Sequence, residues 1–177
     1  MANGILFNHE SEVRGPEFVT RKISQSVAGI CHGSKEPVVL GNLSGVKDWG
    51  YATDYVEGMW MMLRLDYPED FVLGTGESHT VRELAEAAFK DIDIDLEWVG
   101  SGINEVGLSG DREMLVKFSR EFYRPLESDN YRADYSKAKK MLRWEPKVKF
   151  KDLVDIMVRK DIERYSSFSV IDFYFPS

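Results

Sequence analysis

Four polar side chains with different chemistries follow directly on a short apolar run near the N-terminus. The run covers residues 4–7, and the polar residues are Asn8, His9, Glu10 and Arg14. A buried strand whose carboxyl end enters a loop has this pattern, and open α/β sheets bind ligands at that end. An amide, an imidazole and a guanidinium together suit a ribose or a phosphate group. On composition alone, a polar loop with local hydrogen bonds explains the cluster equally well.

A second polar group precedes a predicted helix and contains Lys47, Asp48, Trp49, Asp54 and Tyr55. Lys47 could pair with a phosphate as a point charge, and the helix N-terminus would assist. The alternative favoured by composition is that Lys47 and Asp48 are solvated while Trp49 and Tyr55 belong to the core.

A third candidate is the string Arg124-Pro125-Leu126-Glu127. It places a fixed turn between a guanidinium that can bind an anion and a carboxylate that can accept from hydroxyls, as expected for a phosphate next to a ribose. A match of this length is a weak signal on its own.

Several chemistries have no support in the residue spacing. His9, His32 and His79 lie too far apart for a local metal-binding pattern, so we expect no metal site. The chain has neither a glycine-rich dinucleotide fingerprint nor a P-loop. Tyr135 and Lys139 satisfy a Tyr-x-x-x-Lys spacing, but they fall at a helix start in a Lys-rich segment, which favours a chance match.

The elements that must position these residues alternate between strands and helices, which predicts the α/β class. Apolar runs predict strands at 4–7, 38–42, 71–76 and 96–99, and periodic segments predict helices at 18–30, 53–65, 81–90, within 131–142 and at 150–165. Thr80 and Glu83 form a capping box that opens the helix at 81. Residues 44–49 and 100–110 are expected to be loops. The tail 166–177 fits no helical pattern and is expected to be a docked extension or a poorly ordered end.

Size and charge exclude several classes of function. The chain has 177 residues, 43% of them hydrophobic, which predicts one domain of globular type. Its formal net charge is −7, so no overall basic field attracts nucleic acid or anionic lipid, and an anionic ligand needs a local cluster. No apolar run approaches the roughly 18 residues of a membrane span. The single Cys31 fits a reducing compartment, so we expect a cytoplasmic protein.

Several long strings, in order, resemble GDP-mannose 4,6-dehydratase, an extended short-chain dehydrogenase/reductase. They are Gly4-Ile5-Leu6-Phe7-Asn8-His9-Glu10-Ser11, Phe18-Val19-Thr20-Arg21-Lys22-Ile23, Leu40-Gly41-Asn42-Leu43, Asp48-Trp49-Gly50, Asp54-Tyr55-Val56-Glu57 and Tyr123-Arg124-Pro125. The resemblance implies the last strands of a Rossmann-type parallel sheet plus the smaller C-terminal nucleotide-sugar-binding α/β domain. The resemblance runs from about residue 3 to residue 165. We expect residues 1–165 to form one unit, and the role of 166–177 is unknown.

The resemblance also implies a lyase reaction of nucleotide-sugar metabolism and GDP-fucose biosynthesis. In the family, NADP oxidises the sugar of GDP-mannose at C4, water is eliminated across C5 and C6, and the hydride returns to C6. The glycine-rich loop and the catalytic Thr, Glu, Tyr and Lys lie upstream of the residues matched here. We therefore expect a truncated enzyme, inactive alone. The alternative is a non-catalytic GDP-sugar-binding module that pairs with a separate N-terminal half, or with itself, through the strand edge at 4–7.

The family's binding residues carry over to seven positions. His9 and Arg14 match contacts to NADP, Asn8 matches the amide that approaches the substrate, and Lys22, Lys47, Arg124 and Glu127 match positions around the GDP diphosphate and ribose. No catalytic residue carries over.

Four departures from the family pattern stand out. Glu12 and Val13 replace a Pro and an Arg, and Tyr51 replaces a His. Lys47 stands where the family prefers Arg, which keeps the charge but loses the bidentate fork. Arg143 occupies the Gly of a Leu-Gly-Trp turn, where a left-handed backbone would cost about 1 kcal/mol or more.

Overall fold

The computed structural model describes the backbone of residues 1–122 and 131–174, with side chains to residue 167. The strands are β1 (Gly4–Leu6), β2 (Asn8–Glu10), β3 (Val38–Leu40), β4 (Val46–Lys47), β5 (Trp49–Tyr51), β6 (Phe71–Leu73), β7 (His79–Thr80), β8 (Glu97–Val99), β9 (Val106–Leu108) and β10 (Met114–Phe118). The α-helices are α1 (Val19–Cys31), α2 (Ala52–Met62), α3 (Val81–Lys90), α4 (Ser136–Leu142) and α5 (Phe150–Tyr174), and the 3-10 turns are η1 (Gly102–Asn104) and η2 (Arg120–Phe122). The predicted α/β class is confirmed.

Two parallel strand pairs run through the N-terminal part of the chain. β1 pairs with β6, and β2 pairs with β5. Only Phe7 separates β1 from β2, and its amide extends the first ladder by donating to Leu73 O at 3.0 Å. Asn8 and His9 therefore lie in a strand, opposite Trp49 and Gly50, and not in the expected loop. The loop expected at 44–49 likewise contains β4 and the start of β5.

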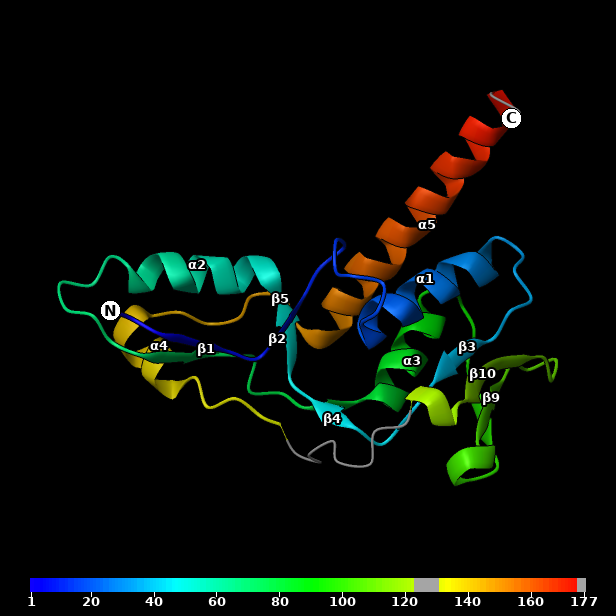
Figure 1. Cartoon of the computed structure of the whole chain (residues 1–177), viewed down its shortest axis with the longest axis horizontal. Coiled ribbons are helices and arrows are strands. Elements are labelled where there is room, and N and C mark those ends of the chain that lie inside the picture. Colours follow the sequence, from blue (N-terminus) through cyan, green and yellow to red (C-terminus); the bar gives the residue numbers. More distant parts are fainter. Residues whose placement is uncertain (123–130, 175–177) are drawn as a thin grey trace.

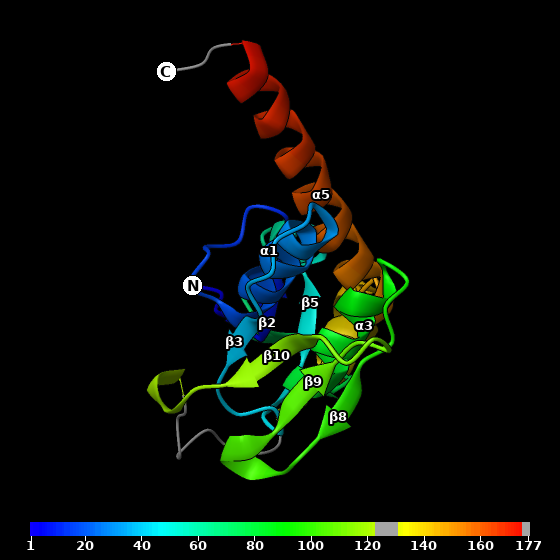
Figure 2. The ribbon, with the colours of Figure 1, turned by 90° about the vertical axis from the view of Figure 1, so that its right-hand side faces the viewer.

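A four-stranded mixed sheet forms the other end of the molecule, in the order β3-β10-β9-β8 (Figure 2). β10 is parallel to β3, and the other pairings are antiparallel. The prediction of a continuous loop at 100–110 is wrong, because β9 is an inner strand of this sheet. Gly107 in β9 interrupts the apolar pattern expected of a strand. The sheet leaves little room for a side chain at this position, because a Cβ there would lie 3.1 Å from Val116 Cβ and 3.2 Å from Trp98 Cζ3.

Two apolar cores stabilise these parts. The larger core joins α1, α3, β3, β10 and the first turns of α5, and it includes the fully buried Phe89 and Trp49. The smaller core joins α2, β6 and α4 around Trp144, which is 1% exposed. Figure 1 shows the corresponding lobes, with α2, α4 and β1 on the left and α1, α3 and β3 on the right. The β2–β5 pair lies at their junction.

Two helix ends have the structure that adjacent residues in the sequence predict. The predicted capping box is confirmed: Thr80 Oγ1 accepts from Glu83 N at 3.0 Å, and Thr80 N donates to Glu83 Oε2 at 2.6 Å. The expected left-handed backbone is also present, since Arg143 ends α4 at φ 56° and ψ 28°.

The C-terminal helix is longer than its pattern predicts. α5 continues through Tyr174, so the expectation that the tail lacks helix is wrong for residues 166–174. Figures 1 and 2 show this end of α5 extending beyond the body of the molecule. At the other end, the Phe150 ring stacks on His79 with centroids 3.7 Å apart, and on Trp49 with centroids 6.1 Å apart. Among the described residues, none of the helices is both long and apolar enough to cross a membrane.

Candidate functional site

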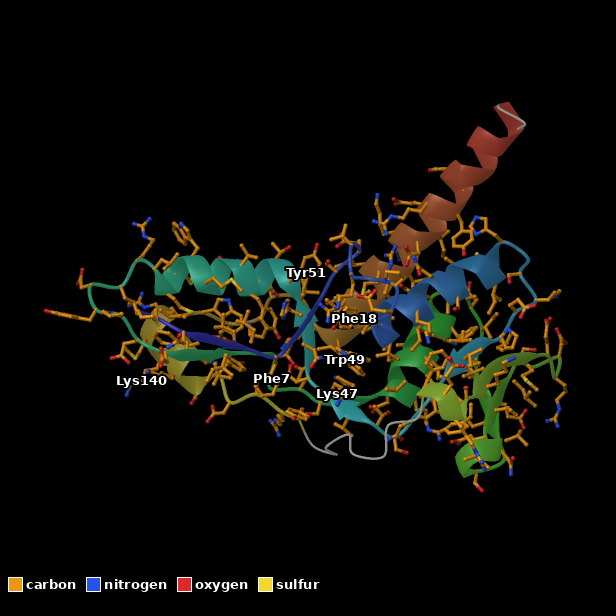
Figure 3. The ribbon with its side chains drawn as sticks, in the orientation of Figure 1. Phe7, Phe18, Lys47, Trp49, Tyr51 and Lys140 are labelled. Carbon is orange, nitrogen blue, oxygen red and sulfur yellow. The ribbon has the colours of Figure 1, made fainter. Side chains whose placement is uncertain are left out.

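A cavity of about 480 Å³ opens where the start of α1 meets the end of β3 and the strand β4. Its wall combines two lysines, Lys22 and Lys47, with two aromatic rings, Phe18 and Phe122. The backbone at residues 39–42 forms another side. Phe18 and Lys47, both labelled in Figure 3, reach this cavity from different segments near the junction of the lobes. Cations and aromatic rings around one hollow form a suitable site for a ligand with a ring and an anionic group.

Lys22 enters the cavity from α1. Its ammonium lies 3.3 Å from the centroid of the Phe122 ring, a cation–π contact. Burial lowers the pKa of Lys22 from its ordinary value of 10.5, and the charge of Glu121 opposes this shift. The lowered pKa means that the cation is incompletely solvated, so an anionic ligand would stabilise it.

Lys47 lies on β4, opposite His79 of β7. Its ammonium is 5.1 Å from the centroid of the Tyr131 ring. Within the part of the chain that the structure describes, neither Lys47 nor Lys22 forms an ion pair with a carboxylate, unlike Lys35, which pairs with Glu113 at 3.0 Å. Two positive charges at the cavity wall are therefore available to an anion.

Asp48, next to Lys47, is completely buried. The expectation that it is solvated is wrong, because four hydrogen-bond donors surround its carboxylate: Thr75 N, Thr75 Oγ1, Gly76 N and Ala133 N. The other half of that interpretation is confirmed, since Trp49 and Tyr55 are core residues with 2% and 0% exposure.

Asn8 and His9 lie on β2, against Tyr55. The Tyr55 hydroxyl donates to Asn8 O at 3.4 Å, and the ring centroids of His9 and Tyr55 are 5.5 Å apart. Burial, assisted by nearby carboxylates, raises the pKa of Tyr55, so its hydroxyl stays protonated and remains a donor. His9 Nδ1 bonds to the Phe7 carbonyl at 2.9 Å, which requires the proton on Nδ1 and leaves Nε2 to accept in the neutral ring.

Arg14 and Glu10 form a compact polar group beside the cavity. Glu10 is 1% exposed and accepts from Thr20 Oγ1 at 2.6 Å. Arg14 Nε lies 3.1 Å from Glu10 Oε2, an ion-pair contact without hydrogen-bond geometry. The guanidinium also covers Phe18, with Cζ 3.5 Å from the ring centroid. Phe18 lines the cavity, whereas Arg14 does not.

The structure brings together only part of the predicted site. Lys22 and Lys47 line the same cavity, whereas Asn8, His9 and Arg14 do not line it. Arg124 and Glu127 lie outside the described residues.

Sequence reasoning missed the aromatic residues of the cavity and the buried clamp beside it. Phe18 belongs to one of the strings that resemble the family, but its apolar character predicts a helix face, and no sequence pattern marks Phe122 as a site residue. Composition predicts a solvated Asp48, because the burial of its carboxylate depends on hydrogen-bond donors from distant segments that no local pattern reveals.

Two other readings of the sequence concern residues outside this cavity. Tyr135 packs edge-on against Trp144 with centroids 5.8 Å apart, and Lys139 pairs with Glu145 at 3.2 Å. Both residues thus make structural contacts, in keeping with a chance Tyr-x-x-x-Lys match. No group of three or more His, Cys, Asp or Glu side chains could hold a metal ion among the residues described.

Comparison with solved structures shows a Rossmann-type α/β fold of the kind found in nucleotide-sugar dehydratases and epimerases. The structure titled RMD from Pseudomonas aeruginosa, complexed with NADPH, superposes with a TM-score of 0.73 at 15% identity, over 91% of this chain and 48% of that one. The dTDP-glucose 4,6-dehydratase of Bacillus anthracis, in complex with NAD, gives 0.68 at 17% identity, over 92% and 45%.

Sequence comparison is more specific. The family model for GDP-mannose 4,6 dehydratase matches residues 1–157, and this chain belongs to that family. GDP-mannose 4,6 dehydratases from Drosophila melanogaster and Homo sapiens are 52% and 51% identical to it over 162 residues, 91% of this chain. The chain spans 41% and 44% of the length of those two relatives.

Proposed function

We propose that the cavity between α1, β3 and β4 binds the nucleoside diphosphate part of a GDP-sugar, with GDP-mannose as the preferred ligand. The observation that carries this proposal is the presence of two lysines without carboxylate partners, Lys22 and Lys47, in the wall of one cavity with Phe18 and Phe122. Membership in the GDP-mannose 4,6-dehydratase family supports the choice of ligand.

Electrostatics make these lysines the decisive groups. The chain carries a net charge of −7, so its overall field repels a diphosphate. Lys22 and Lys47 place two positive charges at the cavity, whose wall also holds the carboxylates of Glu17 and Glu121. Each ammonium pairs with a phosphate as a point charge, worth on the order of 1 kcal/mol where solvent screens it. The aromatic rings of Phe18 and Phe122 add a stacking surface for a base. We assign the diphosphate to Lys22 and Lys47, and the amide of Asn8 to the sugar.

For the whole reaction we propose dehydration of GDP-mannose to GDP-4-keto-6-deoxymannose, with NADP as the cofactor. A nicotinamide dinucleotide, when bound, takes up a hydride and returns it. His9 and Arg14 fit contacts at the edge of such a group: His9 Nε2 is available to accept, and Arg14 Nε, in ion-pair contact with Glu10, makes no hydrogen bond. The chain offers no glycine-rich turn to hold a pyrophosphate. Its own residues thus supply contacts to the cofactor, whereas the catalytic Thr, Glu, Tyr and Lys that the resemblance implies have no counterpart among the matched residues, so we expect the chain alone to be inactive.

We also propose a cytoplasmic location for this chemistry. Cys31 is exposed and free, and an unpaired surface thiol fits a reducing compartment. The acidic balance of the chain argues against a nucleic-acid partner.

Isothermal titration with GDP-mannose tests the proposal, with GDP and NADP in separate runs. We expect binding of GDP-mannose and GDP by the wild type, and a loss of about tenfold in affinity in Lys47→Ala or Lys22→Ala, since one phosphate contact of 1.4 kcal/mol corresponds to tenfold. Lys35→Ala is the matched control, because it removes the same charge at a residue that does not line the cavity. Absence of binding at millimolar ligand, or equal losses in all three variants, contradicts the proposal.

A second candidate function is that of a non-catalytic module that pairs with a separate dinucleotide-binding half. The observation that favours it is the free edge of β1, which pairs only with β6 among the described strands and carries Ile5 at 57% exposure. Trp60 of α2 and Leu63, which directly follows this helix, are also apolar and are 56% and 80% exposed. Pairing at the edge of β1 would satisfy its free backbone groups and bury Ile5.

Size-exclusion chromatography of this chain mixed with the N-terminal half of a family member tests the second candidate. A co-eluting complex supports it, and two independent peaks under all conditions argue against it. A dimer of the chain alone would show that the edge pairs with a second copy.

A further inference from the structure

Asp48 is a fully buried carboxylate that lies between Lys47 of the cavity and Trp49 of the core. Its Oδ1 accepts from Thr75 N at 2.8 Å and Thr75 Oγ1 at 2.7 Å, and its Oδ2 accepts from Gly76 N at 2.9 Å and Ala133 N at 3.0 Å. In the described part of the chain no lysine or arginine pairs with it. The charge is therefore stabilised by hydrogen-bond donors alone, and three of the four are backbone amides from two distant segments.

The second of these segments carries the aromatic ring beside Lys47. Tyr131 precedes Ala133 by two residues, and its ring lies 5.1 Å from the Lys47 ammonium. The same ring packs edge-on against Phe7, with centroids 6.2 Å apart. Two further bonds join this segment to the turn that Asp48 also holds: Ser78 Oγ donates to Tyr131 O at 2.9 Å, and Arg132 Nε donates to Gly76 O at 2.6 Å.

We infer that Asp48 is a positioning residue for the cavity: it clamps the turn at Thr75–Gly76 to the segment at 131–133, and so holds Tyr131 against Lys47. This inference rests on the proposed function only for its ligand. The clamp holds a ring beside the ammonium of Lys47, which forms no ion pair with a carboxylate within the described residues. Without the clamp, Lys47 samples solvent and its contribution to anion binding falls.

The variant Asp48→Asn tests the clamp with little change of shape. An amide offers one oxygen and one NH₂ group, so in either orientation the NH₂ group faces at least one backbone N–H donor that then lacks an acceptor. Asp54→Asn is the matched control, since Asp54 is also a buried aspartate that accepts two backbone amides, from Lys147 and Val148, on a single oxygen. An asparagine can keep that one oxygen in place.

The first readout needs no ligand. Lysine acetylation by limiting acetic anhydride, followed by mass spectrometry of each site, reports how exposed and free each ammonium is. We expect the rate at Lys47 relative to Lys35 to rise severalfold in Asp48→Asn and to stay unchanged in Asp54→Asn. An unchanged ratio in a folded Asp48→Asn protein overturns the inference. A rise at all lysines together also overturns it, because that indicates general unfolding.

The second readout separates this inference from the proposed function. GDP and guanosine are titrated into each protein, and we expect Asp48→Asn to weaken GDP by about tenfold while guanosine changes little, since one phosphate contact is affected. In a Lys47→Ala background the same change has no further effect on GDP. Equal losses for GDP and guanosine overturn the positioning role. If the wild type binds neither ligand, the proposed function fails while the acetylation result still decides the inference.

If Asp48→Asn does not fold, two milder variants take its place. Thr75→Val removes one of the four donors and leaves the backbone bonds intact, and Tyr131→Leu removes the ring beside Lys47 without touching the clamp. Both are expected to raise the relative acetylation of Lys47, the second more than the first. No change in either variant overturns the inference.

Discussion

Replacing Arg143 by glycine is expected to stabilise the protein. Arg143 ends α4 with a left-handed backbone, φ 56° and ψ 28°, and its side chain is exposed. For a residue with a Cβ this conformation costs about 1–2 kcal/mol. Glycine adopts it without strain but loses more chain entropy on folding, about 0.5–1 kcal/mol. The net expectation is a gain of about 1 kcal/mol in the free energy of unfolding, because the exposed side chain contributes little packing.

The assay is urea unfolding together with thermal unfolding of matched variants. A gain of 1 kcal/mol raises the melting temperature of a chain of this size by about 2–4 °C. Arg143→Ala is the essential control, since it removes the same charge and side chain but keeps the Cβ. Arg143→Asn should fall between the two, because asparagine tolerates the left-handed region better than alanine. If Arg143→Gly is no more stable than Arg143→Ala, a left-handed backbone at residue 143 does not destabilise the protein, and the prediction is wrong.

Two further predictions concern α3. Burial and the nearby Asp155 raise the pKa of Asp91 from 3.8 to about 6. The folded state therefore binds a proton more readily than the unfolded state, and the free energy of unfolding should fall as pH rises through 6. Asp91→Asn should remove this pH dependence and raise the free energy of unfolding by about 1 kcal/mol at pH 7.5 after solvent screening. Urea unfolding at pH 5 and 7.5 checks it, and the same pH slope in both proteins would contradict it. Thr80→Ala should cost about 1 kcal/mol by removing the capping oxygen, whereas Thr80→Ser should cost little; circular dichroism melts compare the two, and equal losses would show that the hydroxyl is not the cause.

Local signals in the sequence predicted the features that depend on neighbouring residues. The capping box at Thr80 and the left-handed Arg143 each rest on a few adjacent residues, and both are present in the structure. The alternation of apolar runs with periodic segments was enough to give the α/β class, because burial imposes those periods.

What the sequence left out depends on contacts between distant segments. β9 and β10 pair with each other and with β3, and Gly107 in β9 makes that segment look like a loop. The burial of Asp48 requires donors from residues 75, 76 and 133, which no local pattern brings together. Similarly, the cavity joins Lys22 and Lys47 through the packing of α1 on β3, so their proximity followed only from resemblance to the family.

The continuity of β1 and β2 limits how the chain can vary in length. Phe7 alone separates the two strands, and it is itself bonded to Leu73, so the segment 4–10 contains no slack between its two partners. A single inserted or deleted residue would shift the alternation of side chains and turn one strand's buried face outward. Substitutions within this segment affect one contact at a time, but a change in length would move Asn8 and His9 together relative to β5, so insertions and deletions should be tolerated in the loops that flank it and excluded from residues 4–10.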